Sequence, residues 1–206
     1  MTKSPSKTPP SWKVHLRRQS AIVSRWLHIY LSMVSFAVVL FFAATGLTLN
    51  HPDWFASQQR TVVRQGVVDK SLLGKDPNQL ALVELLRSRE HIHGAVGDVR
   101  IDDQQISISL RAPGYTADTN IDRDTGKYEL TEVSNGFVAV VNDLHKGRDS
   151  GKAWGWLIDA SAILLVLVSL TGFILLWFLH KRRTSGFLIA LLGTIAVAVF
   201  YKLYVP

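Results

Sequence analysis

The sequence predicts a membrane α-helical protein with three transmembrane helices and an α+β domain inserted between helices 1 and 2. Three observations predict this class. Long apolar runs occupy residues 21–51, 153–180 and 186–206, whereas residues 52–152 carry charges of both signs and turn residues. The mean hydropathy is positive and 48% of the residues are hydrophobic, which is too apolar for an ordinary soluble domain.

The first apolar run is long enough to cross a bilayer. Between His28 and His51 it holds 22 residues without a charge, and a helix rising about 1.5 Å per residue then covers the roughly 30 Å of a bilayer core. Pro52 ends the helix, since proline disfavours helix at the residue before it. Several basic residues precede the charge-free core of the run, which places its N-terminal end and the basic tail of residues 1–20 in the cytoplasm: Lys13, Arg17, Arg18 and Arg25.

The second and third runs agree with that orientation. The second run is followed by the loop of residues 181–185, which contains Lys181-Arg182-Arg183 and which the positive-inside rule also places in the cytoplasm. The third run, residues 186–206, then returns the C-terminus to the outside. Residues 52–152 are therefore expected on the outer side of the membrane.

Residues 52–152 predict a helix packed on an antiparallel sheet. Residues 78–92 carry apolar side chains at helical spacing, including Leu80, Val83 and Leu86. Four stretches with strand-like alternation follow, at residues 96–102, 104–112, 116–124 and 127–133, and a tight turn at residues 122–126 joins the last two. A short helix over residues 136–145 then leads to the second apolar run.

Composition excludes several classes of function. The net charge is +7, but the basic residues collect beside the apolar runs, which favours a role in membrane topology over nucleic-acid binding. The sequence has no cysteine, which excludes thiolate metal sites, iron–sulfur clusters, covalent c-type haem and disulfides. It also lacks the GxGxxG, P-loop, GxSxG and HExxH motifs.

Four histidines stand at or near the ends of the first two runs: His28, His51, His145 and His180. An imidazole at a membrane helix is a functional hypothesis by default, because burying it without a partner is costly. Antiparallel helices would bring His28 to His180 at the inner boundary and His51 to His145 at the outer one. Each level offers two imidazoles, which suits six-coordinate b-type haem better than four-coordinate zinc. Roughly 34 Å of helix separates His28 from His51, so two haems are expected.

Two glycines and two further histidines complete the candidates. Gly46 and Gly172 each follow a threonine inside a bulky apolar run; they would allow close helix packing, or leave room for the edge of a flat macrocycle, and both explanations stay open. His91 and His93 follow a predicted helix in an exposed polar turn. This position favours the interpretation that neither histidine binds a metal, and weak iron or copper binding is the alternative.

Three motifs occur in an order typical of one family: SRWLHIYLSMVSFAVVLFFAATGLTLNH, then NIDRDTGKYEL, then DLHKG followed by LTGFILLW. In this order they resemble the PepSY-associated transmembrane proteins, over nearly all of the chain from about Arg17 to Arg183. The resemblance implies a periplasmic PepSY domain over residues 52–152 and location in a bacterial inner membrane.

The resemblance also implies a cofactor, because relatives include larger inner-membrane iron and siderophore reductases that bind haem between their transmembrane helices. The haem role then falls on His28, His51, His145 and His180, with two haem b per chain. The expected function is transmembrane electron transfer from a cytoplasmic or quinone donor to a periplasmic acceptor, a ferric siderophore or a redox protein, within membrane lipid. The sequence has no flavin or nicotinamide domain, so reduction by this chain alone stays open. The alternative is a cofactor-free, membrane-anchored PepSY module that binds or restrains a partner protein.

Overall fold

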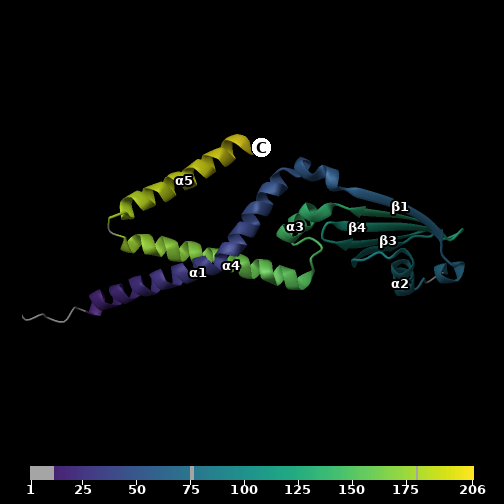
Figure 1. The fold of residues 1–206 in the computed structure, drawn as a ribbon, viewed down its shortest axis with the longest axis horizontal. Helices are drawn as coiled ribbons and strands as arrows, with labels where there is room; N and C mark the ends of the chain where they lie inside the picture. The colour runs from purple at the N-terminus through teal and green to yellow at the C-terminus, as the bar shows by residue number, and fades with distance from the viewer. Residues whose placement is uncertain (1–11, 75–76, 180) are drawn as a thin grey trace, which may run out of the picture. The chain divides into compact units, whose positions relative to one another are not determined.

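The structure is a computed structural model that describes residues 12–74, 77–179 and 181–206 (Figure 1). It divides into two compact units, here named the helical unit (residues 1–39 and 160–206) and the sheet unit (residues 40–159). Two long helices, α1 (Trp12–Asn50) and α4 (Gly151–Phe178), contribute residues to both units.

Three helices in the described chain are long and apolar enough to cross a membrane: α1, α4 and α5 (Arg183–Tyr204). The prediction of three transmembrane helices is confirmed at this level of length and composition. The helix α1 has 39 residues, so it is about 58 Å long and exceeds the roughly 30 Å of a bilayer core. It begins at Trp12 and ends at Asn50, two residues before Pro52.

The helices α4 and α5 form a hairpin within the helical unit (Figure 1). The ring of Phe187 lies edge-on to Phe173 and Trp177, with centroid distances of 5.1 and 5.9 Å. The guanidinium of Arg183 lies 4.6 Å above the Trp177 ring, a cation–π contact at the start of α5. Beyond Phe187, the side chains of α5 are exposed in the described structure, as expected of a helix that faces lipid.

The sheet unit contains a five-stranded antiparallel sheet in the order β1-β5-β4-β3-β2. The predicted antiparallel sheet between the first and second spanning helices is therefore present, with one more described strand, β1, than the sequence predicts. The strands are β1 (Arg60–Val67), β2 (Ala95–Ile101), β3 (Gln105–Ala112), β4 (Tyr115–Asp122) and β5 (Lys127–Ser134). Short helices connect them to the rest: η1 (Pro52–Gln58), η2 (Lys70–Leu73), α2 (Gln79–Glu90) and α3 (Gly136–Lys146).

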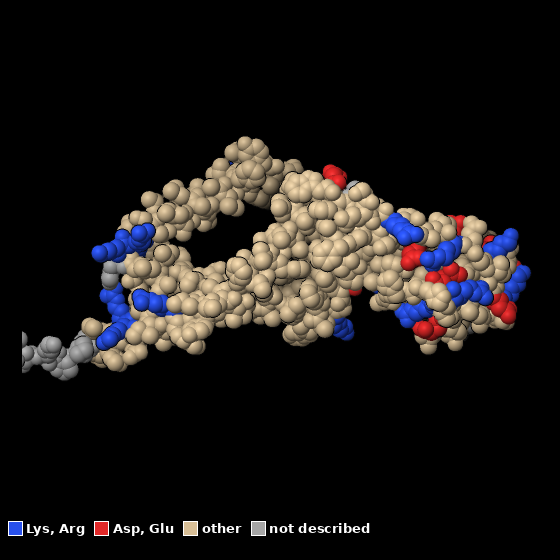
Figure 2. All heavy atoms as spheres, viewed as in Figure 1, with Lys and Arg blue, Asp and Glu red and all other residues tan. Residues whose placement is uncertain are grey.

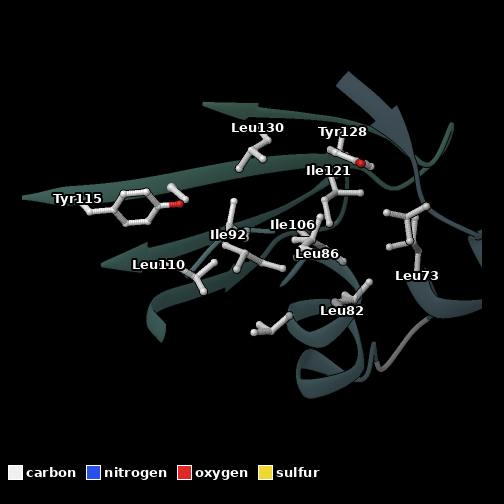
Figure 3. Close-up of a cluster of buried hydrophobic side chains, with 14 residues drawn as sticks. Leu73, Leu82, Leu86, Ile92, Ile106, Leu110, Tyr115, Ile121, Tyr128 and Leu130 are labelled. Carbon is white, nitrogen blue, oxygen red and sulfur yellow. The ribbon is translucent and has the colours of Figure 1, made fainter. Parts of the chain in front are cut away.

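The core lies between α2 and one face of the sheet (Figure 3). The helix α2 starts where the Asn78 side chain accepts a hydrogen bond from the Ala81 N–H. It turns Leu82, Val83 and Leu86 into the core. Leu80, which the helical spacing also places among the apolar positions, is 70% exposed, because it lies in the first turn of the helix and points away from the sheet side.

The other face of the sheet carries no helix among the described residues and is mainly polar, with Val63 and Val67 of β1 exposed on it. Side chains on neighbouring strands bond across it: Ser107 donates to Asn120 at 2.9 Å, and Ser109 donates to Asp118 at 2.6 Å. At the β4–β5 turn, Asp122 accepts from the Thr125 N–H at 2.7 Å, and this bond lowers the pKa of that carboxyl. Figure 2 shows Lys, Arg, Asp and Glu intermixed over the sheet.

Candidate functional site

The first histidine cluster lies in the helical unit, where α1 meets α4. His28 Nδ1 is 3.1 Å from Thr171 Oγ1. The His28 ring also packs on Gly172: a Cβ added to that glycine would lie 3.0 Å from His28 Cε1. The histidine of one helix therefore sits against the Thr-Gly pair of the other.

Small and polar residues on both helices explain this close approach. In the helical unit, the less exposed positions of α1 recur every three or four residues, as Ser24, His28, Leu31 and Ser35, the pattern of a helix–helix seam. Ser35 is 2% exposed, and Ser161 of α4 is 6% exposed. Small side chains at such a seam let the backbones of two membrane helices approach each other.

The second histidine cluster lies in the sheet unit, where α3 meets the C-terminal part of α1. His145 Nδ1 is 2.6 Å from Thr45 Oγ1, and Thr45 is 5% exposed. A Cβ added to Gly46 would lie 3.8 Å from His145 Cε1. The Phe42 ring meets the His145 ring edge-on at a centroid distance of 4.9 Å. This cluster repeats the chemistry of the first one, a histidine against a Thr-Gly pair.

The helix α3 is held on several sides, and this fixes the position of His145. Thr48 donates to Asn142 Oδ1 at 2.6 Å, and Asp143 Oδ2 accepts from the Gly114 N–H at 2.8 Å. Trp154 Nε1 of α4 donates to the Leu144 carbonyl at 2.7 Å. Gly147, at φ +70°, ends the helix and caps it.

The remaining predicted haem ligands are not brought into these clusters by any described contact. The His51 ring stacks on Trp54 at a centroid distance of 4.1 Å, and no hydrogen bond or ring contact joins His51 to His145, both of which are described. His180 lies outside the described residues. Both predicted pairs, His28/His180 and His51/His145, stay predictions.

The other two histidines lie on the sheet unit. His91 follows α2 in the left-handed conformation, at φ 56°. The exposed ring of His93 stacks on Tyr115 at 3.8 Å, and burial together with the nearby Glu132 carboxylate raises the pKa of Tyr115 to about 12. Among the described residues, no three His, Cys, Asp or Glu side chains are grouped as a metal site would need.

Two functional candidates escape the sequence analysis, Thr45 and Thr171. Both precede a glycine that the sequence singles out, but as neighbours of small residues rather than as histidine partners. The sequence feature that could have identified these threonines is that each Thr-Gly pair lies in an apolar run that must pack against another helix. The sequence positions alone do not show which histidine each pair contacts.

Comparison with known proteins places the chain among membrane proteins. A family model described as PepSY_TM-like matches residues 22–206, a range that includes both histidine clusters. No curated protein and no solved structure matches the chain.

Proposed function

The chain belongs to the PepSY-associated transmembrane family, and from this premise we propose that it is a di-haem b electron-transfer protein of the bacterial inner membrane. It passes electrons from a cytoplasmic or quinone donor to a periplasmic acceptor, in iron or siderophore reduction. Residues 52–152, which form most of the sheet unit, are then its periplasmic PepSY domain. His28 and His180 hold one haem, and His51 and His145 hold the other.

One observation carries the proposal: each Thr-Gly pair of the spanning helices meets a histidine. His28 lies on Thr171-Gly172, and His145 lies on Thr45-Gly46. Placing an imidazole at a membrane helix costs free energy, and a neutral hydroxyl and a glycine beside it offset only part of this cost. Such a histidine is therefore a candidate for a functional role. Two such arrangements in one short chain favour two equivalent centres.

The donor chemistry of both clusters fits a b-type haem. Imidazole nitrogen is a common axial ligand of haem iron, and no described residue is hydrogen-bonded to Nε2 of His28 or of His145. The surroundings are apolar or small, with Phe42 beside His145 and glycine beside both rings. The absence of cysteine means that a haem would be held without covalent attachment.

The chain's own residues would bind and shield the cofactor. A bound haem would supply a one-electron redox centre, which no side chain of this protein offers. His28 and His145 would each hold one haem through an imidazole nitrogen, while Phe42 and the packed faces of α1 and α4 would limit the access of water. The second ligands, His180 and His51, are assigned on sequence alone. Lipid surrounds the three helices.

Haem stoichiometry tests the proposal. Protein expressed with ample haem should show a Soret band, and a pyridine haemochrome assay on quantified protein should approach two haems per chain. His28→Ala and His145→Ala should each remove one spectrally distinct haem. His15→Ala is the matched control: this histidine is exposed on α1, outside both clusters, and its loss should leave both haems.

Three results would contradict the proposal. Colourless protein with no Soret band would exclude haem binding. A ratio that stays near one in fully loaded protein would remove one of the two centres. Loss of the same haem component in His28→Ala and His145→Ala would mean that both residues serve one centre.

A second candidate is supported by the sheet unit, and it is a cofactor-free PepSY module that binds a partner protein. The uncovered sheet face has an open hollow of about 810 Å³, lined mainly by polar side chains of β1, β3, β4, β5 and the β2–β3 turn. Both clustered histidines also have hydrogen-bond partners without any cofactor. Colourless protein that unfolds cooperatively would favour this candidate over the first.

A further inference from the structure

The hydroxyl groups of Thr45 and Thr171 each have three hydrogen-bonding neighbours but a single proton. Thr171 Oγ1 lies 2.8 Å from the Leu167 carbonyl and 3.0 Å from the Val168 carbonyl of its own helix, and 3.1 Å from His28 Nδ1. A backbone carbonyl can only accept a hydrogen bond, whereas an imidazole nitrogen can donate or accept. The position of the threonine proton therefore decides the role of the histidine.

Other hydroxyls on the spanning helices show where that proton goes in the absence of a histidine. Thr194 of α5 donates to the Ala190 carbonyl at 2.9 Å, and Ser169 of α4 donates to the Leu165 carbonyl at 2.9 Å. Donation to a carbonyl one turn back is thus the ordinary state of Ser and Thr on these helices. Thr171 makes the same bond, so towards His28 its oxygen is an acceptor, and Nδ1 must carry the proton.

Counting hydrogen bonds gives the same answer. With the proton on Nδ1, both groups donate: His28 to Thr171, and Thr171 to its own helix. With the proton on Nε2, Thr171 must turn to donate to Nδ1 and gives up its carbonyl bond. The Nε2–H would then have no acceptor among the described residues, so this form makes one hydrogen bond where the other makes two.

The second cluster repeats this arrangement with other elements. Thr45 Oγ1 is 2.6 Å from the Phe41 carbonyl of its own helix and 2.6 Å from His145 Nδ1. By the same count, Thr45 donates to the carbonyl and accepts from His145. Two histidines on different helices, α1 and α3, are thus held in one tautomer by the same device.

We propose that Thr45 and Thr171 are positioning residues that keep the proton of His145 and His28 on Nδ1, so that Nε2 is the nitrogen that binds a metal. The tautomer follows from the hydrogen bonds alone, while the metal-binding part rests on the proposed haem function. Ligating histidines almost always donate their other N–H to a fixed partner, which orients the ring and raises its basicity. In both clusters a threonine hydroxyl is the partner that accepts this N–H.

The tautomer is measurable in the cofactor-free full-length protein. Long-range ¹H–¹⁵N correlation spectra of the imidazole rings separate Nδ1–H from Nε2–H forms, and His28→Gln and His145→Gln assign the two signals. Both histidines should show one form, with the proton on Nδ1. Thr171→Val should move His28 alone to a mixture or to the Nε2–H form, Thr45→Val should do so for His145 alone, and Thr171→Ser should restore the original form.

The matched control is Thr194→Val, which removes the same carbonyl bond from a helix that carries no histidine and should change neither signal. A wild-type spectrum with the proton on Nε2 overturns the proposal, as does a Thr171→Val spectrum in which His28 is unchanged. In haem-loaded protein, Thr171→Val should weaken the binding of one haem about 10- to 100-fold. An intact tautomer pattern in colourless protein would refute the haem function alone, whereas two bound haems with mixed tautomers would refute this proposal alone.

Discussion

Gly46 and Gly172 both follow a threonine in the sequence, yet they differ in how much room they leave for a side chain. A Cβ at Gly172 would press on the His28 ring at 3.0 Å, whereas at Gly46 it would meet the His145 ring at 3.8 Å, an ordinary van der Waals distance. Adding a methyl group to a helical glycine otherwise stabilises a helix by roughly 0.5–1 kcal/mol. Replacing each glycine with alanine should therefore have opposite effects on the stability of the protein.

We expect Gly46→Ala to unfold at or above the temperature of the wild type, and Gly172→Ala to unfold below it. The cause at Gly172 is displacement of His28 and loss of its bond to Thr171, worth about 1 kcal/mol. Thermal unfolding of detergent-solubilised protein measures both. Equal shifts in the two variants would show that the difference between 3.0 and 3.8 Å has no consequence.

Single functional residues can be predicted from the sequence in the case of the histidines but not in the case of their threonine partners. Histidines at the ends of apolar runs identify His28 and His145 as candidates, because imidazole is conspicuous in a membrane helix. A threonine is not conspicuous, since it satisfies its own hydroxyl on the helix backbone. Thr45 and Thr171 become functional candidates only when the packing of α1 with α3 and α4 is known.

At the scale of elements, α3 joins the sheet to the second histidine cluster. Asp143 accepts from the Gly114 N–H of the β3–β4 turn, and its carboxylate is 4.0 Å from Arg148. Two residues further along the same helix, His145 meets Thr45. A change in the β3–β4 turn could therefore shift His145, which lies within one helical turn of Asp143.

Replacing Asp143 should loosen α3 without unfolding the sheet. Asp143→Ala leaves the Gly114 N–H without its acceptor, at a cost of about 1–3 kcal/mol. Hydrogen–deuterium exchange should rise in α3 and stay unchanged in β3 and β4. Asp103→Ala is the control, since this exposed carboxylate lies in the β2–β3 turn. Unchanged exchange in α3 would mean that other contacts, such as Trp154 to Leu144, hold the helix alone.

The elements themselves were largely predictable. Alternation in β3, with Ile106, Ile108 and Leu110 buried on one face, indicates a strand directly, because that face must be covered. The strand β1 escapes this test: it is an edge strand without a fully buried residue, and Gly66 interrupts its pattern. Its place beside β5 depends on pairing between distant residues, Arg60 with Ser134 through Val67 with Lys127, which composition does not reveal.

At the scale of the whole chain, charge is strongly segregated. Residues 1–39 and 160–206 contain 10 Lys and Arg but no Asp or Glu. The full chain has 23 Lys and Arg and 16 Asp and Glu, so residues 40–159 hold the remaining 13 basic and all 16 acidic residues. Figure 2 shows the basic side chains of the helical unit near the start of α1 and at the α4–α5 turn. The topology signal in this segregation is the Lys and Arg that flank the spanning helices, since the positive-inside rule counts these residues near helix ends.

The last prediction follows from this segregation. Because basic residues near membrane helices are retained in the cytoplasm, Arg17, Arg18 and the Lys181-Arg182-Arg183 loop should lie inside, and residues 52–152 should lie in the periplasm. An alkaline phosphatase fusion after Asp103, active only when exported, should be active, and the same fusion after Arg183 should be inactive. In this topology α4 ends and α5 begins on the side of the membrane where α1 begins. Reversal of one fusion alone would therefore mean that a helix does not cross. Reversal of both fusions would mean that the chain is inverted, and the haem on His28 would then face the periplasm.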